Sequence, residues 1–341
     1  MKARLFHSAF HARLKQLLFA ALLLTATGVR AQDFHLTHYD AAKIYLNPAM
    51  TGMFDGYYRI HANYRNQWSA VATKPFQTAA VAFDMPFGRY GGGVQIMNNR
   101  AGYGNYNVLQ MNFSGAYDLQ LDKGNIHHAA FGMEVGVMQK SVDFGRLTFD
   151  NQYSMADGGG FDVSLPNGEN YNSERVYLLD ISAGGLYYYA KEGSRFNPFI
   201  GFSAFHLNRP TETFFGIANK LPIHYIIHAG SRIGINERLQ LQARVLQMWQ
   251  INDKETVVGL LANIYLPNSD SYVIVGPSFR SKDAAIMEVG LKKGPFTYRM
   301  SYDVNVSTLK PATNNRGGIE FSVIYIAKRK TPVIAPNCPR L

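Results

Sequence analysis

The chain has 341 residues, 13% of them aromatic and 17% charged, and a formal net charge of +10 at pH 7. Residues 1–31 hold five of the 34 basic residues and none of the 24 acidic ones, so the remainder has 29 basic and 24 acidic residues and a net charge of +5. This small excess is spread along the chain, which argues against nucleic-acid binding. The single cysteine, Cys338, excludes an intrachain disulfide framework.

Residues 1–31 have the organisation of a secretory signal peptide. Four basic residues precede the apolar run 17–24, and Val-Arg-Ala at 29–31 fits a cleavage site before Gln32. A membrane anchor would need roughly 20 apolar residues, and this run is shorter. The residue directly after the cleavage site is Gln32 and not a cysteine, which disfavours a lipoprotein. We therefore predict an exported protein.

Residues 108–121 carry the clearest structural pattern of the chain. Polar residues such as Gln110, Asn112 and Asp118 alternate with Leu109, Met111 and their apolar successors. Successive side chains of a strand point to opposite faces, so the segment predicts a strand with one polar and one apolar face.

Segments of similar length fill the rest of the chain. A strand needs about 9–11 residues to cross the apolar layer of a membrane. About fourteen candidates meet this length, an even number, as bacterial barrels prefer. Their predicted spans are 57–69, 75–86, 89–99, 104–121, 126–141, 174–190, 195–208, 222–235, 238–251, 254–267, 271–281, 283–293, 295–305 and 316–327.

The long connections between these strands all fall on one side of the predicted barrel. Every second connection is a short hairpin signal rich in Gly, Pro, Asn and Asp, such as 122–125 and 293–295. The long connections, 142–173, 209–221 and 306–315, all fall on the other side. Barrels of the outer membrane have short periplasmic turns opposite longer outer loops. The pattern therefore predicts an outer-membrane location with both termini in the periplasm.

Together these features predict an all-β fold, a single transmembrane antiparallel β-barrel of about 14 strands that spans residues 57–327. Aromatic residues near strand ends, among them Trp68, Trp249 and Tyr265, fit the girdles at the two membrane interfaces. A β-sandwich core would explain the aromatic content but not its placement. An N-terminal segment, 32–56, precedes the barrel and a periplasmic tail, 328–341, follows it. The barrel is expected to contact outer-membrane lipid.

The interior of this barrel is expected to be largely filled. Fourteen strands enclose a modest space. Many large polar side chains are predicted to point inward, namely Gln110, Asn112, Asp118, Gln240, Gln242, Arg244 and Arg299. The segment 32–56 is expected to pack inside the barrel or to cap its periplasmic mouth. A scaffold is therefore favoured over a general pore.

Motifs of catalytic or cofactor chemistry are missing from the sequence, and no cofactor or metal is predicted. His224 and His228 would share one strand face about 13 Å apart, too far to hold one metal ion. The triplets 91–93 and 158–160 lack the strand–loop–helix context of a phosphate loop. The first triplet predicts close approach of another backbone to a strand, and the second a flexible outer loop.

Several segments resemble the PorP/SprF family of the type IX secretion and gliding machinery of Bacteroidetes. The likeness begins with Tyr-Leu-Asn-Pro-Ala-Met-Thr-Gly at 45–52 and Tyr-Arg-Asn-Gln-Trp at 64–68. It continues through Gly-Arg-Leu-Thr-Phe at 145–149, the segments 202–210 and 221–225, and the ending Cys-Pro-Arg at 338–340. The stretch 33–43 departs from the family, because it lacks the usual Gln-Phe-Ser-Gln-Tyr-like run.

The resemblance implies a non-enzymatic barrel in secretion, cargo attachment or gliding motility. Such proteins partner secreted cargo with a type B C-terminal domain, often a very large adhesin, and other type IX components, including periplasmic ones. Three groups of residues are candidate sites. The plug or partner contact is Asn47, Pro48, Tyr64, Arg65, Asn66, Gln67 and Trp68. The cargo-facing loop is Leu147, Phe149, Gln152 and Tyr153, and the outer-loop segment is His206, Asn208, Pro210, Leu221 and Pro222.

Within the first group, Arg65 would be costly on a lipid-facing side, roughly 2–4 kcal/mol at midplane. We therefore predict that it lies in the lumen and pairs with an acidic wall residue, with Asn66 and Trp68 on the opposite face near the outer rim. Residues 64–68 either fix the plug and rim or contact a partner directly, and the sequence leaves both open.

Two other functions stay open at this stage. A barrel of this size can hold a lumen, so a channel or a transporter of hydrophobic compounds is the first alternative. A membrane-embedded lipid hydrolase is the second. It would need Ser301, His224 and Asp303 to converge at one rim, and the sequence does not bring them together.

Overall fold

The computed structural model describes residues 33–69, 74–155, 158–169, 171, 173–216, 218–308 and 310–328. The predicted signal peptide and the tail beyond Lys328, with Cys338, lie outside these residues. The chain divides into the units Met1–Asp33 and Phe34–Leu341, and the second is the subject below. Within the described residues, no helix has the length and apolarity to cross a membrane.

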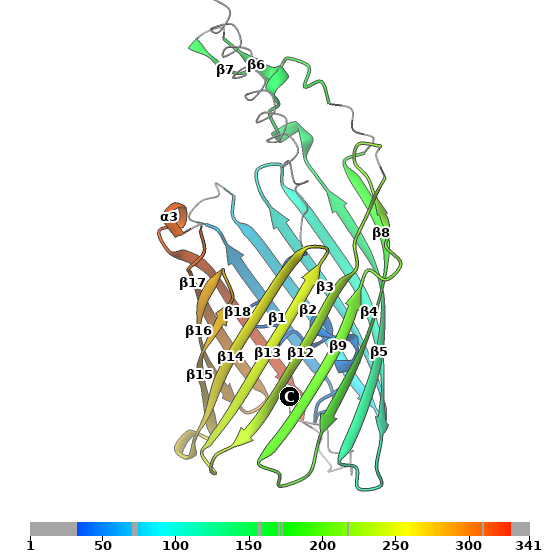
Figure 1. Cartoon of the computed structure of the whole chain (residues 1–341), viewed down its shortest axis with the longest axis vertical. Helices are drawn as coiled ribbons and strands as arrows, with labels where there is room; N and C mark the ends of the chain where they lie inside the picture. Colours follow the sequence, from blue (N-terminus) through cyan, green and yellow to red (C-terminus); the bar gives the residue numbers. More distant parts are fainter. Residues whose placement is uncertain are drawn as a thin grey trace, which may run out of the picture. The chain divides into compact units, whose positions relative to one another are not determined.

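Fourteen antiparallel strands close into one barrel (Figure 1). Each pairs with its sequence neighbour in the barrel, and β1 closes the ring by pairing with β18. The strands are β1 (Arg59–Gln67), β2 (Phe76–Phe87), β3 (Tyr90–Ala101), β4 (Tyr106–Gln120), β5 (His127–Ser141), β8 (Arg175–Tyr189), β9 (Phe196–Phe205), β12 (His224–Gly234), β13 (Leu239–Gln250), β14 (Asp253–Leu266), β15 (Ser271–Arg280), β16 (Ala284–Lys293), β17 (Phe296–Asn305) and β18 (Arg316–Ile326). The number and the approximate spans agree with the prediction.

Alternation along each strand separates an apolar outer face from a polar inner one. In β4, Gln110, Asn112 and Asp118 are buried, whereas Met111 and Phe113 are exposed on the other face. Such an outer face is that of a barrel surrounded by lipid. The inward positions predicted for Arg244 and Arg299 are confirmed, because both side chains are buried and contact other inward residues.

One rim has only short turns and the other has the three longest connections beside several short ones, so they are here called the short-turn rim and the long-loop rim. At the short-turn rim the chain turns at residues 88–89, 121–126, 190–195, 235–238, 267–270 and 294–295. The long-loop rim carries the connections 142–174, 206–223 and 306–315, at the top of Figure 1. The first contains the hairpin β6 (Tyr153–Ser154) and β7 (Gly160–Phe161), the second the hairpin β10 (Thr211–Glu212) and β11 (Asn219–Lys220), and the third the helix α3 (Lys310–Thr313). The two hairpins were not predicted, since strands of two residues leave no alternation in a sequence.

The residues before β1 contact the inward face of strands from all parts of the barrel. They include the short helix α2 (Lys43–Leu46) and the 3-10 turn η1 (Pro48–Met50), and nearly all of residues 36–54 are buried. These residues thus contact inward-facing groups of the barrel strands. His35 lies 3.2 Å from Glu255, near the long-loop end of β14. Gly52 bonds Asp84, near the short-turn end of β2, so the segment runs along the barrel interior.

Candidate functional site

Glycines of the wall form the seat on which residues 47–52 lie. A Cβ atom at Gly132 of β5 would stand 2.3 Å from the Ala49 nitrogen, and one at Gly91 of β3 would stand 2.0 Å from the Thr51 oxygen. At Gly184 of β8 it would stand 2.0 Å from Asn47 Oδ1. Only residues without a side chain allow this approach. The close backbone approach predicted for the 91–93 triplet is thus confirmed at Gly91.

Asn47 is the hydrogen-bonding centre of this contact. Its Nδ2 lies 3.0 Å from the Gly185 oxygen, 3.2 Å from the Phe202 oxygen and 3.1 Å from His228 Nε2. Its Oδ1 accepts the Ala49 N–H at 2.9 Å, which caps η1, and Pro48 occupies the position where a helix needs no N–H donor. One side chain therefore shapes the turn and joins it to β8, β9 and β12.

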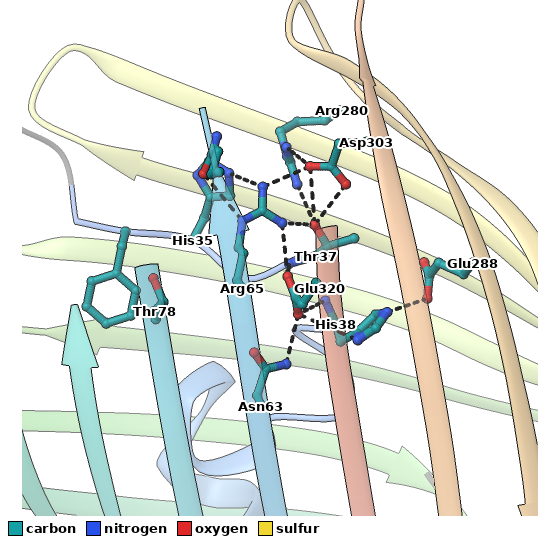
Figure 2. A network of polar contacts seen from close by, with 12 residues as sticks. His35, Thr37, His38, Asn63, Arg65, Thr78, Arg280, Glu288, Asp303 and Glu320 are labelled. Atoms are coloured by element: carbon teal, nitrogen blue, oxygen red, sulfur yellow. Dashed lines mark hydrogen bonds and ion pairs between the residues drawn. The ribbon is translucent and has the colours of Figure 1, made fainter. Parts of the chain in front are cut away.

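Arg65 and Glu320 anchor the other end of the segment (Figure 2). Glu320 of β18 accepts the backbone N–H groups of Thr37 at 2.6 Å and His38 at 2.8 Å, and the Arg65 Nη1 donor at 2.9 Å. Arg65 also bonds Asp303 of β17 at 2.8 Å, and Arg280 of β15 bonds the same carboxylate at 3.0 Å. The predicted pairing of an inward Arg65 with acidic wall residues is confirmed. These buried charges are compensated by charge-assisted hydrogen bonds on several sides.

A second ionic group holds the middle of the segment. The Asp40 carboxylate accepts hydrogen bonds from the guanidiniums of Arg244 at 2.5 Å and Arg299 at 2.8 Å. Both guanidiniums also bond Glu288 of β16. Asp40 is therefore held as a carboxylate between the strands β13 and β17.

The C-terminal end of the segment, at Thr51 and Gly52, is also held by polar contacts, near the short-turn rim. Asp84 of β2 accepts the Gly52 N–H at 2.7 Å and pairs with Arg59 Nη2 at 2.6 Å. Gly52 has a φ of +73°, in the left-handed region where glycine is favoured. Thr51 Oγ1 lies 2.5 Å from Ser114 Oγ of β4.

The other residues of the Tyr64–Trp68 group separate by face. Tyr64 is 41% exposed on the outer face. Asn66 and Gln67 are half-buried at the end of β1, and Gln67 Oε1 accepts the Arg65 Nε donor at 3.3 Å. Trp68 follows β1 at the long-loop rim and packs edge-on against Phe76, with ring centroids 4.8 Å apart. Within this group the structure thus brings only Arg65 and Gln67 to the inward network.

The four predicted residues of the 142–174 loop lie along its length. Leu147 covers Gly104, where an added Cβ would stand 2.8 Å from the leucine side chain. Gln152 is buried, accepts the Phe149 N–H at 3.1 Å and donates to the Leu165 oxygen at 3.0 Å. Tyr153 is 52% exposed in β6. Three of the four therefore fold the loop, and the tyrosine is on its surface.

The connection between β9 and β12 brings the third predicted group onto the long-loop end of β8. His206 Nδ1 lies 2.8 Å from Asp180 Oδ1, and Asn208 donates to the Leu179 oxygen at 2.7 Å. Leu221, whose N–H bonds the Pro210 oxygen at 2.9 Å, is buried beside Val108, Met138 and Leu178. The Pro222 oxygen accepts Gln250 Nε2 at 3.3 Å.

Most residues that hold the segment to the wall were missed by reasoning from the sequence, on the segment as well as on the strands. The missed residues are Asp40, Asp84, Gly132, Gly184, His228, Glu288, Asp303 and Glu320. An acidic residue at an inward position of a strand is a usable signal for a buried ion pair, and it was available for Glu288 and Glu320. The seats at Gly132 and Gly184 had no signal comparable to the 91–93 triplet.

Comparison with known proteins decides the family. Residues 29–325 match the family model described as type IX secretion system membrane protein PorP/SprF. The chain belongs to the PorP/SprF family. It is therefore an outer-membrane β-barrel of the type IX secretion system, as its order of sequence motifs predicted. No curated protein matches the chain.

Solved structures similar to this PorP/SprF protein are other membrane barrels. The toluene transporter TbuX of Ralstonia pickettii gives a TM-score of 0.50 at 11% identity, over 84% of this chain and 93% of that chain. A FadL homologue of Pseudomonas aeruginosa gives 0.46 at 8% identity, over 84% and 94%. The translocator domain of the autotransporter NalP of Neisseria meningitidis gives 0.37 at 11% identity, over 94% and 97%. At 11% identity the likeness to TbuX concerns the fold alone.

The residues considered for a hydrolase do not assemble in the PorP/SprF barrel. Asp303 is held by Arg65 and Arg280, and Ser301 Oγ is buried without a hydrogen-bond partner among the described residues. A serine nucleophile needs a base within hydrogen-bond reach. His224 instead lies beside Phe205, with ring centroids 6.0 Å apart.

Proposed function

We propose that this barrel is a non-enzymatic component that supports the secretion or surface attachment of cargo with a type B C-terminal domain. The observation that carries the proposal is the gathering of the folded connections 142–174 and 206–223 at one rim of a type IX secretion system barrel. Loops held by a rigid barrel are suited to binding a partner. The short-turn rim and the C-terminal tail are the proposed contacts with periplasmic components.

The proposal includes a closed lumen. Residues 36–54 are nearly all buried and bond strands on opposite sides of the barrel, such as Gly185 in β8 and Glu320 in β18. A lumen filled in this manner leaves the outer surface as the place for cargo. A channel, which is the alternative function, would require residues 36–54 to leave the lumen.

The purified barrel should therefore show no large, steady conductance in planar lipid bilayers. The physical reason is the ionic network around Asp40 and Thr37, which fixes the segment across the interior. Stable open-channel currents from the wild-type protein would contradict the closed lumen and favour a channel or a transporter of hydrophobic compounds.

We further propose that the long-loop rim faces the cell exterior, as in barrels with short periplasmic turns. An epitope inserted at Gly159 should then be labelled on intact cells, and one at Gly193 only after permeabilisation. The reverse pattern would invert the assignment. The C-terminal side follows β18 at the short-turn rim and is placed in the periplasm. His35, in contrast, lies at the level of the long-loop rim, which argues against a periplasmic position for the start of the segment.

Deletion of the gene tests the role itself. The proposal expects an intact outer membrane and normal uptake of small solutes, with one or a few large proteins lost from the cell surface. Quantitative mass spectrometry of proteins shaved from intact cells measures that loss. An unchanged set of surface proteins, or a defect confined to solute uptake, would contradict the proposal.

A further inference from the structure

The 142–174 loop differs in charge from the rest of the chain. It holds six of the 24 acidic residues and only one basic residue, Arg146. Residues 32–141 and 175–341 together hold the remaining 28 basic and 18 acidic residues of the predicted mature chain. A net charge of −5 is therefore concentrated in one loop of a basic protein. Four of the acidic residues in the loop are exposed, namely Asp150, Asp162, Glu169 and Glu174.

The base of this loop is a folded structure. Phe144 is buried and stacks on Tyr171, with ring centroids 4.2 Å apart and an interplanar angle of 14°. Phe215 of the neighbouring 206–223 connection packs edge-on against Phe144 at 5.5 Å. The Asp143 N–H bonds the Gly104 oxygen at 2.8 Å, which ties the loop to the turn between β3 and β4. Two neighbouring connections thus support the base of the loop.

The middle of the loop is joined across its two arms by Gln152. Besides the bond to Leu165, the Gln152 oxygen accepts the Asp162 N–H at 2.8 Å. Asp162 in turn accepts the N–H and the hydroxyl of Ser164, at 2.9 and 2.6 Å. These hydrogen bonds lower the pKa of the Asp162 carboxyl, so its negative charge persists to a lower pH than usual.

The end of the loop exposes apolar side chains around the β6–β7 hairpin. Tyr153 packs edge-on against Phe161 across the hairpin at 5.4 Å, yet each is more than half exposed, at 52% and 53%. Val163 is 71% exposed and Met155 81%. Figure 1 shows the hairpin well beyond the rim of the barrel strands. Apolar side chains gathered on a projecting, supported hairpin mark an interaction surface.

We propose that this hairpin inserts into an apolar recess that is rimmed by lysine and arginine on the cargo domain. The inference rests on the proposed function and specifies the chemistry of its partner. Charge complementarity selects a basic partner, because the loop carries −5 around four exposed apolar side chains. An anionic lipid surface or a nucleic acid would be repelled by the same charge. A second copy of this loop would be repelled as well.

Binding kinetics separate the two parts of this proposal. The probe is the isolated type B C-terminal domain of one secreted cargo, and the receptor is the full barrel in nanodiscs. In the variant D150N/D162N/E169Q/E174Q we expect the association rate at low salt to fall about tenfold and its salt dependence to flatten. In F161S/V163S we expect a dissociation rate raised about tenfold, because the apolar contact is lost.

The control is E192Q/E237Q, which removes two exposed acidic residues at the short-turn rim. It should bind the isolated cargo domain as the wild type does, because no periplasmic component is present in this measurement. Heat-modifiable migration in gels checks that each variant forms the barrel. Unchanged association in the fourfold variant would overturn the proposal, even where removal of the whole loop abolishes binding. Binding that survives removal of the loop would instead contradict the proposed docking function. Self-association of the barrel through the hairpin, measured by mass photometry, would identify a second copy as the occupant and overturn the proposal.

Discussion

Replacing Gly132 by leucine should open the lumen and destabilise the barrel. A Cβ atom alone would stand 2.3 Å from the Ala49 nitrogen and 2.3 Å from the Pro48 carbonyl carbon, so backbone and not a flexible side chain must move. Overpacking of a closed site costs about 1–3 kcal/mol, and the leucine adds three further carbon atoms. We expect the segment to leave its seat. Conductance in planar bilayers should rise from the closed level of the wild type.

Gly115→Leu is the matched control for this substitution. Gly115 lies on β4 at a position whose side chain would point to the outer face. An added Cβ would have only the Gly91 oxygen near it, at 3.9 Å. This variant should stay closed and as stable as the wild type. A Gly132→Leu barrel that assembles, stays closed and melts at the wild-type temperature would show that the segment does not need the glycine seat.

Replacing Arg65 by methionine should be among the most destabilising single changes in the chain. The side chain is 1% exposed and bonds both Glu320, at 2.9 Å, and Asp303, at 2.8 Å. Removing one partner of a buried ion pair costs about 3–5 kcal/mol, because the other charge stays buried. Arg280 still neutralises Asp303 in this variant, so the carboxylate that loses its cationic partner is Glu320. Thermal unfolding in detergent, followed by the loss of heat-modifiable migration, measures the effect.

The double variant R65M/E320Q distinguishes an uncompensated charge from lost packing. Neutralising Glu320 removes the buried charge and keeps one acceptor oxygen, so that one of the N–H groups of Thr37 and His38, which bond different carboxylate oxygens, stays paired. The double variant should therefore be more stable than R65M. Equal or lower stability of the double variant would assign the loss to packing and to the remaining hydrogen bonds.

The barrel could be predicted from the sequence because alternation is a local pattern. Lipid outside and polar contacts inside impose opposite preferences on successive residues, and Leu109–Asp118 displays both. Turn residues such as those at 122–125 mark where strands end. Nothing in the alternation depends on which strands are neighbours. The fold was therefore accessible without knowledge of long-range contacts.

The interior site was accessible only in part, since its partners lie far apart in the sequence. Arg65 was predicted inward from the cost of a lipid-facing charge, but its partners Asp303 and Glu320 depend on the closure of β1 against β18. Asn47 was identified through a family motif, and its bonds to Gly185 and His228 need three-dimensional coordinates. A single glycine such as Gly132 has many possible roles in a strand, so its contact with Pro48 and Ala49 could not be predicted from the sequence.

We propose that cargo is held at the long-loop rim of a closed barrel. The decisive experiment measures surface display of a reporter fused to a type B C-terminal domain, in cells whose barrel has residues 142–173 replaced by an Asn-Gly turn. Barrel assembly should be preserved, because strands make the pairing and the loop adds little to it. We predict that display falls strongly while the amount of barrel in the outer membrane is unchanged. Full display of the reporter by the loop-deleted barrel would contradict the claim.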